Sequence, residues 1–124
     1  IIYPELHYGR DALVGIALFL THLAESGMDC SVMRKCYPDY FISKNKITLP
    51  EGADADQLLA AFEEAHADDD INTVDGGKVD YPTGWVHLRK SNTEPIIRLY
   101  AEAGSSEEAE RIAGEAMQTI NDLI

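Results

Sequence analysis

The chain has 124 residues, of which 45% are hydrophobic and 26% are charged. These fractions predict an ordinary globular domain with a core of its own and exclude a chain that is disordered throughout. With 22 acidic and 10 basic residues the formal net charge is −12, so binding to nucleic acid or to an anionic membrane is not expected. Two cysteines are too few for a disulfide framework, and reduced thiols in a cytoplasmic protein are expected.

The first predicted element is a helix from Asp11 to Ser26. Asp11 can cap its start, and Gly27 can end it in the left-handed conformation. Its apolar residues cover nearly all sides, which is typical of a helix buried in a larger body. The apolar or glycine stretch Ala12–Leu20 is far shorter than the roughly 20 residues that span a bilayer. We therefore expect a buried helix and no membrane span.

Three elements are predicted next in the chain. Residues 29–38 suit a short helix and a turn, and residues 40–49 have the composition of a β-strand that ends before Pro50. A second long helix is predicted from Asp54, as its cap, to His66, because its apolar residues recur at helical spacing.

The second half of the chain shows the alternation of short strands. Residues 71–75 and 79–81 form two such segments, joined by the hairpin signal Gly76-Gly77. Residues 85–89 and 97–103 form two more. In the segment 85–89, Val86 and Leu88 face one way while Trp85, His87 and Arg89 face the other.

The last helix is the clearest element. Ser105 or Ser106 caps it, Ser105 and Glu108 fit a capping box, and its apolar residues lie on one stripe. The order from Tyr40 onward is β-α-β-β-β-β-α, in which the short strands can merge. The predicted fold class is therefore α+β, with an antiparallel sheet of about four strands, two helices on one face and an extra N-terminal helix before it.

The stretch most informative about function is Arg89-Lys90-Ser91-Asn92-Thr93-Glu94-Pro95-Ile96-Ile97-Arg98. Three of the ten basic residues fall here, in a chain otherwise rich in acid. Guanidinium groups bind phosphate oxygens, and hydroxyl and backbone N–H groups complete such a site. A loop between two strands would let Arg89 and Arg98 flank one anion.

A second interpretation of the same stretch is purely structural. Ser91 and Glu94 also fit a helix capping box, with a helix that begins near Pro95 and leaves both arginines as surface charges. The alternation after Ile96 and the break at Gly104 favour a strand instead.

Arg89 to Arg98 resembles the R-x-S-[GN]-T-E-P-x-x-R phosphate-binding loop of the α-D-phosphohexomutase superfamily, which includes phosphoglucomutase, phosphomannomutase and phosphoglucosamine mutase. The resemblance continues through the segments 80–89 and 98–103 on either side of the loop. Residues 2–13 are similar to the end of the family's third domain. The resemblance implies that residues 1–28 are the C-terminal tail of that third domain and that residues 29–124 are the C-terminal phosphate-binding domain.

The resemblance also implies a binding site for the substrate phosphate. Its residues would be Arg89, Ser91, Asn92, Thr93 and Arg98, with Asn92 acting mainly through its backbone N–H group. Lys90 departs from the usual Pro or Ala, and we expect it to face solvent and add positive field. Two local alternatives stay open: Ser91 and Thr93 only cap the turn, or Arg98 only pairs with Glu102.

The family's phosphorylated serine loop, Asp-x-Asp-x-Asp magnesium loop and sugar-recognition loop have no counterpart in this sequence. Asp68-Asp69-Asp70 lacks the alternating spacing, so it is a weak candidate for metal. The resemblance therefore implies no catalytic residue and no metal ligand in this chain, and Mg²⁺ only in a longer parent enzyme.

The implied function is to bind the non-reacting phosphate of a hexose phosphate while the parent enzyme, an isomerase, exchanges phosphate between positions 1 and 6. Its partners would be the hexose phosphate and the upstream domains of the same chain. The alternative is a non-catalytic phosphate-binding or interaction domain.

Overall fold

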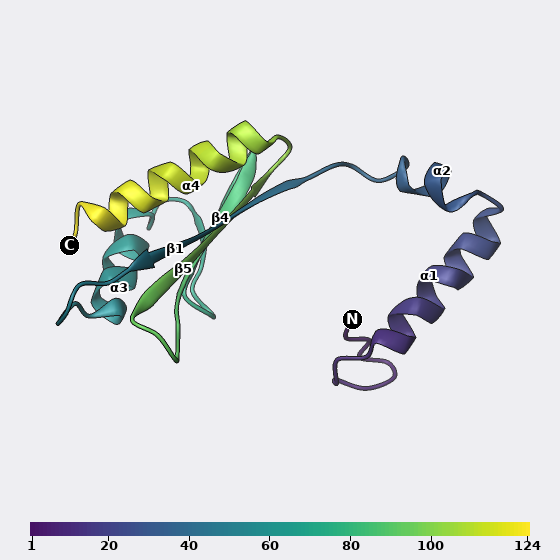
Figure 1. Cartoon of the computed structure of the whole chain (residues 1–124), viewed down its shortest axis with the longest axis horizontal. Coiled ribbons are helices and arrows are strands. Elements are labelled where there is room, and N and C mark those ends of the chain that lie inside the picture. The colour runs from purple at the N-terminus through teal and green to yellow at the C-terminus, as the bar shows by residue number, and fades with distance from the viewer. The chain divides into compact units, whose positions relative to one another are not determined.

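The computed structural model describes residues 1 to 124. The chain forms two compact units, Ile1–Pro38 and Asp39–Ile124. In chain order the elements are α1 (Ala12–Ser26), α2 (Cys30–Arg34), β1 (Phe41–Thr48), α3 (Ala55–Ala65), β2 (Asp70–Asn72), β3 (Gly77–Tyr81), β4 (Gly84–Lys90), β5 (Ile96–Ala103) and α4 (Ser106–Asn121) (Figure 1). None of these helices has both the length and the apolar character that crossing a bilayer requires.

The first unit contains α1 and α2, and α1 begins and ends where the sequence indicates. The Asp11 carboxylate accepts hydrogen bonds from two backbone N–H groups of the first turn, at 2.8 and 3.0 Å. Gly27 ends the helix with a φ of 64°. His22 Nε2 and the Tyr37 hydroxyl lie 2.9 Å apart and join α1 to the segment after α2.

Within this chain α1 is not buried. No residue of α1 is buried, and large apolar side chains such as Leu13 and Ile16 are 77% and 54% exposed. The expected burial of this helix in a larger body therefore stays a prediction. The first compact unit ends after Pro38, ten residues beyond the predicted tail 1–28, and the assignment of that tail to a third domain also stays a prediction.

The second unit confirms the predicted α+β class. Its strands form one antiparallel sheet in the order β1-β5-β4-β3-β2. The sheet has five strands where about four were expected, because β2 is a separate edge strand of three residues that pairs with β3 from Asp70↔Asp80 to Asn72↔Lys78. The sequence predicts strands at 71–75 and 79–81 and leaves open whether they merge; in the structure they stay separate and pair with each other as β2 and β3.

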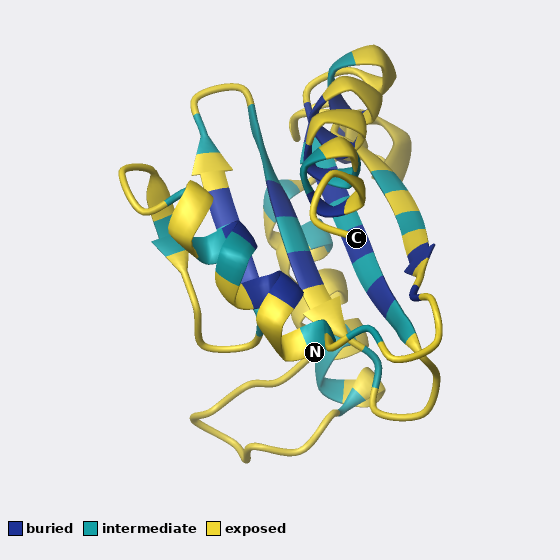
Figure 2. Cartoon of the chain, turned by 90° about the vertical axis from the view of Figure 1, so that its left-hand side faces the viewer, coloured by how far each residue is buried: buried dark blue, intermediate teal, exposed yellow.

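Both helices of the second unit, α3 and α4, cover one face of the sheet (Figure 1). Residues alternate between half-buried and buried along β5, from Ile96 to Ala103, and Figure 2 shows such alternation along the strands. Phe62 of α3 and Ile120 of α4 are completely buried in the same hydrophobic core. Burying one such side chain contributes about 1.5–3 kcal/mol to the free energy of folding. Both helices therefore pack on the apolar face of the sheet, and the polar face is left free of helices.

The predicted capping box at the start of α4 forms only in part. Ser105 Oγ accepts a hydrogen bond from the N–H group of Glu108 at 3.2 Å. The Glu108 carboxylate, however, accepts hydrogen bonds from Arg111, at 2.7 and 2.8 Å, and from the Thr83 hydroxyl, at 2.8 Å. These bonds, Arg111 first, lower the pKa of Glu108 to about 2. The Thr83 contact fixes the β3–β4 turn to the start of α4.

Candidate functional site

The antiparallel pairing of β4 and β5 places Arg89 directly opposite Arg98. Their neighbours Leu88 and Ile97 are completely buried on the helix side. Both arginines therefore project from the helix-free face, since consecutive strand residues point to opposite sides. Two like charges opposite each other destabilise a sheet, and an anion between them would relieve that repulsion.

The segment between β4 and β5 is a closed loop and not the start of a helix. The Ser91 N–H group donates to the Ile96 carbonyl at 3.0 Å, and the Ile96 N–H group donates to the Glu94 carbonyl at 2.8 Å. The Pro95 carbonyl accepts from the Leu49 N–H group at 2.9 Å, which holds the loop to the end of β1. The structural interpretation with a helix from Pro95 is therefore wrong, because β5 begins at Ile96.

The loop presents polar groups that are weakly engaged within the protein. Ser91 Oγ lies 3.4 Å from both the Thr93 N–H nitrogen and Thr93 Oγ1, which is long for hydroxyl hydrogen bonds. The backbone N–H groups of Asn92 and Glu94 donate to no protein acceptor. Both hydroxyls and both N–H groups are free to bind an exposed ligand.

All five residues expected to bind phosphate line one surface pocket of about 250 Å³. Arg89 and Arg98 come from the two strands, and Ser91, Asn92 and Thr93 come from the loop between them. Lys90 is the sixth lining residue. Besides Lys90, the lining has two guanidinium groups, two hydroxyls and an amide, and no carboxylate, so it suits an oxyanion.

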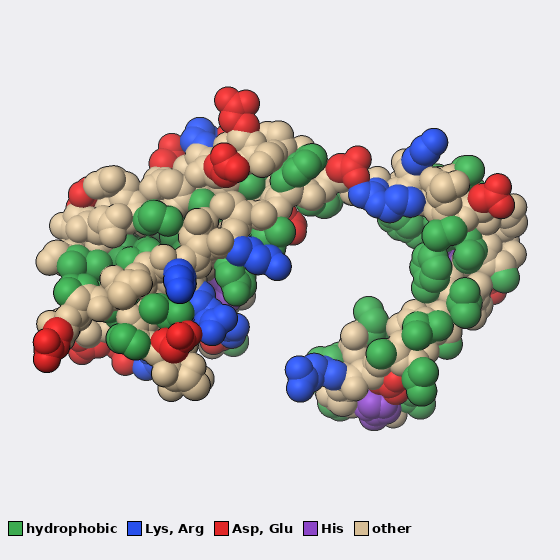
Figure 3. All heavy atoms as spheres, viewed as in Figure 1, with side chains coloured by type: hydrophobic (Ala, Val, Ile, Leu, Met, Phe, Trp, Pro, Cys, Tyr) green, Lys and Arg blue, Asp and Glu red, His purple; other side chains and the backbone are tan.

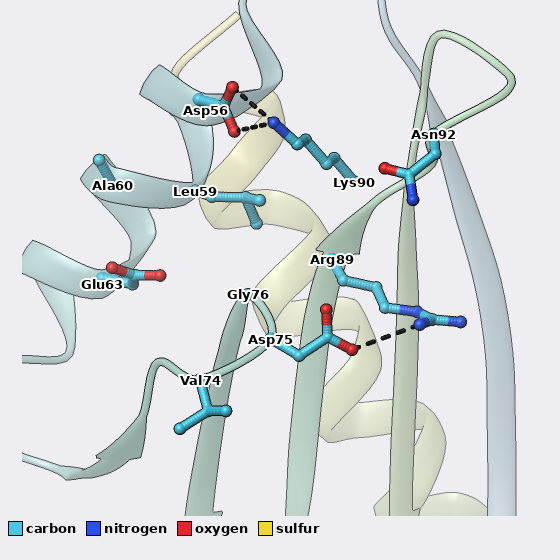
Figure 4. Close-up of a pocket in the computed structure, with 10 residues that line it drawn as sticks. All are labelled: Asp56, Leu59, Ala60, Glu63, Val74, Asp75, Gly76, Arg89, Lys90 and Asn92. Carbon is cyan, nitrogen blue, oxygen red and sulfur yellow. Dashed lines mark hydrogen bonds and ion pairs between the residues drawn. The ribbon is translucent and has the colours of Figure 1, made fainter.

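Asp75 is a neighbour of this site that sequence patterns did not single out. Arg89 Nη1 donates to its carboxylate at 3.3 Å (Figure 4), and His87 Nε2 donates to its backbone carbonyl at 2.6 Å. The next residue, Gly76, has a φ of 76°, and a side chain there would collide with the Leu88 carbonyl. The sequence predicts a hairpin at Gly76-Gly77, but it does not show that this turn packs against β4.

Lys90 differs from its expected role. Its side chain is exposed, but Nζ donates to both carboxylate oxygens of Asp56 on α3, at 2.6 and 2.7 Å. In Figure 4 Lys90 reaches toward α3 while Arg89 extends the other way. Asp56 therefore offsets much of the positive field that Lys90 was expected to add.

Arg98 does not pair with Glu102. Its nearest carboxylate is that of Glu94, at 3.9 Å from Nη2, and Glu102 instead accepts a hydrogen bond from Trp85 Nε1 at 3.2 Å. A half-exposed contact at this distance is worth little. Arg98 is therefore available to an incoming anion.

A larger hollow of about 330 Å³ lies between α3 and the loop and shares Arg89, Lys90 and Asn92 with the smaller pocket (Figure 4). Three carboxylates line it, those of Asp56, Glu63 and Asp75. Carboxylates repel an anion, so the smaller pocket is the better phosphate site.

No group of three or more His, Cys, Asp or Glu side chains is placed to hold a metal ion. In the acidic stretch 68–70, the Asp69 carboxylate is hydrogen-bonded to His66 Nδ1 at 2.7 Å. The residues present therefore do not fit the magnesium site that the resemblance implies for a parent enzyme.

Comparison with known proteins finds similarity to the family that the sequence resembles. Residues 46–119 match the family model of the phosphoglucomutase/phosphomannomutase C-terminal domain. A probable phosphoglucosamine mutase of Methanopyrus kandleri is 32% identical over 99% of this chain and 27% of its own length. A phosphoglucomutase/phosphomannomutase of Thermococcus kodakarensis is 36% identical over 88% of this chain and 24% of its own.

A solved structure shares the fold. The crystal structure of a phosphoglucomutase/phosphomannomutase family protein from Burkholderia thailandensis superposes with a TM-score of 0.57 and 25% identity, over 76% of this chain and 20% of that one. The chain thus spans about a quarter of the length of the curated relatives it matches. Since the family model covers more than half of the sequence, the chain belongs to the phosphoglucomutase/phosphomannomutase family and contains its C-terminal domain.

Proposed function

We propose that this chain binds the phosphate group of a hexose phosphate that is not reacting, in a longer enzyme that interconverts hexose 1- and 6-phosphates. One observation carries the proposal: the β4–β5 register sets Arg89 opposite Arg98, beside a loop whose hydroxyl and N–H groups are free. The names of the relatives, which are mutases of phosphorylated sugars, support it.

The site would recognise phosphate and not the sugar. The two guanidinium groups would bind the phosphate oxygens from the sheet side, while Ser91, Thr93 and the Asn92 N–H group donate from the loop. Binding energy from this remote group would orient the reacting end of the sugar elsewhere. The phosphates at positions 1 and 6 of the sugar must each bind this site in turn. A site that contacts only the phosphate group would accept the ligand in either orientation.

The bond-breaking chemistry would belong to other parts of the longer protein. A phosphorylated serine and Mg²⁺, both implied by the family resemblance, would be supplied by the upstream domains, which are the partners of this domain. Residues 1–28 would be the tail of the third domain, and the exposed apolar side chains of α1 support its packing against that domain. The choice of hexose would be made there as well, since the sugar-recognition loop that the resemblance implies has no counterpart in this chain; the relatives' names do differ in the sugar.

The proposal is tested by an NMR titration of the 15N-labelled chain with glucose 6-phosphate, glucose 1-phosphate and glucose. Both phosphates should shift the amides of Ser91, Asn92 and Thr93, with a Kd of about 1 mM because the rest of the enzyme is missing. Glucose should shift none of them.

Two arginine variants complete this experiment. Arg89→Gln should weaken binding of both phosphates roughly tenfold or more, because hydrogen bonds to charged groups are the strong ones. Arg111→Gln removes the same charge from α4, where Arg111 pairs with Glu108 and Glu115, and should bind as the wild type does. Equal affinity of Arg89→Gln and wild type, with a folded spectrum, would refute the proposed site.

A further inference from the structure

The helix-free face of the sheet continues the line of basic residues beyond the two arginines. The register sets Lys46 of β1 opposite Arg98 of β5, which in turn lies opposite Arg89 of β4. The neighbours Ile47, Ile97 and Leu88 are buried on the helix side, so the three cations share the helix-free face. Figure 3 shows basic side chains gathered over β1 and β5 of the second unit.

This arrangement has an energetic cost without a ligand. Arg98 has a like charge on each side, and like charges directly opposite each other destabilise a sheet. Arg89 has Asp75 as a partner at 3.3 Å, and Arg98 has only the distant Glu94. Lys46 forms no ion pair or side-chain hydrogen bond, although the chain carries 22 acidic residues. Its full charge is therefore available to an external anion.

Lys46 also lies next to the phosphate pocket. It lines a third hollow, of about 360 Å³, whose charged lining residues are Lys44, Lys46, Arg98 and one carboxylate, that of Glu94. Arg98 lines the 250 Å³ pocket as well. Neighbouring strands are about 4.8 Å apart, and a lysine side chain is longer than that spacing. An anion over Arg98 is therefore within reach of Lys46 from the β1 side.

We propose that Lys46 is a third cation of the phosphate site, which contacts a phosphomonoester dianion bound over Arg98. This inference rests on the proposed function and goes beyond the loop, since it adds a residue from β1, 43 positions before Arg89 in the chain. The row of three cations selects a doubly charged phosphate over a singly charged carboxylate or sulfonate.

The experiment measures binding of inorganic phosphate and glucose 6-phosphate to the full 124-residue chain by NMR titration. Lys46→Gln should raise both Kd values roughly fivefold, the size of one exposed charge contact. Lys46→Arg, which keeps the charge, should restore at least half of the lost affinity. Lys35→Gln removes an exposed lysine from the first unit and should not change the Kd values.

Lys44→Gln tests whether Lys46 acts by contact. Lys44 is two residues along β1 on the same face, opposite Tyr100, so a contact predicts a smaller loss for Lys44→Gln than for Lys46→Gln. A melting curve without ligand adds an independent result: Lys46→Gln should melt at or above the wild-type temperature because it relieves like-charge repulsion. A structural role for Lys46 would lower that temperature.

The outcomes separate the two proposals. If Arg98→Gln weakens binding while Lys46→Gln matches Lys35→Gln, the third-cation inference is wrong and the phosphate site stands. Equal losses of phosphate affinity for Lys44→Gln and Lys46→Gln would also overturn it, since they would indicate a long-range electrostatic effect of positive charge and no direct contact by Lys46. If Arg98→Gln binds as the wild type does, both proposals are wrong.

Discussion

At the scale of single residues, the two arginines of the proposed phosphate pocket each have a weak ion pair. Asp75 lies 3.3 Å from Arg89 and Glu94 lies 3.9 Å from Arg98, and all four side chains are at least 39% exposed. Exposed pairs of this kind contribute about 0–1 kcal/mol. They are strong enough to reduce the repulsion between the arginines and weak enough for a phosphate to displace them.

Asp75→Asn tests this competition. Removing a negative charge beside Arg89 should strengthen phosphate binding roughly two- to fivefold, because the ligand no longer displaces a carboxylate. The Kd of inorganic phosphate from an NMR titration is the measurement. Asp80→Asn, which removes a carboxylate paired with Lys78 on the same sheet, is the matched control and should leave the Kd unchanged. Weaker binding by Asp75→Asn would show that Asp75 positions Arg89 instead of competing for it.

At the scale of elements, the turn between β2 and β3 supports the site from the side. It presents Asp75 to Arg89 and is held to β4 by the hydrogen bond from His87. This contact requires the chain to pass close to the Leu88 carbonyl, and only glycine fits at position 76.

Gly76→Ala should therefore destabilise the second unit and weaken the phosphate site. Gly52→Ala is a matched control, since Gly52 also has a positive φ, 87°, but open space around it. The control should cost about 1 kcal/mol of unfolding free energy from backbone strain alone. Gly76→Ala should cost about 2 kcal/mol more, because the turn must move away from β4. Urea unfolding measures both, and equal costs would mean that the turn adapts without loss.

At the scale of the whole molecule, the two compact units differ in what they bury. Every residue of the main hydrophobic core lies in the second unit, from Ile47 to Ile120. The first unit buries only Met33 and exposes the apolar side chains of α1, which form much of its surface in Figure 3. The second unit has the sheet, both covering helices and the whole candidate site.

Residues 39–124 should accordingly fold without the first unit. We expect the shortened chain to unfold at the same urea concentration as the second unit of the full chain and to bind phosphate with an unchanged Kd. Light scattering should show the shortened chain to be a monomer, and the full chain to associate at high concentration through the exposed face of α1. An unfolded shortened chain would show that the first unit stabilises the second.

Much of the fold follows from local patterns in the sequence. The caps at Asp11, Asp54 and Ser105 define the starts of three helices, and each side chain accepts backbone hydrogen bonds as expected. Period-two alternation identifies β4 and β5 and assigns Arg89 and Arg98 to one face. The stretch Arg89–Arg98 is continuous in the sequence, and its resemblance to the family's loop named the five proposed phosphate-binding residues before the structure was known.

No local sequence pattern predicted the contacts between residues that are far apart in the chain. The pairing of Lys90 with Asp56, of Arg89 with Asp75, and of Glu108 with Thr83 joins residues 34, 14 and 25 positions apart. The sequence indicated strands at 71–75 and 79–81 but not whether they merge, and the structure keeps them apart as β2 and β3. The sequence by itself determined the elements, the polar face of the sheet and the loop, because these depend on spacing along the chain. Only the tertiary structure decided the strand order β1-β5-β4 that sets Lys46 beside Arg98, because strand pairing depends on the packing of side chains far apart in sequence.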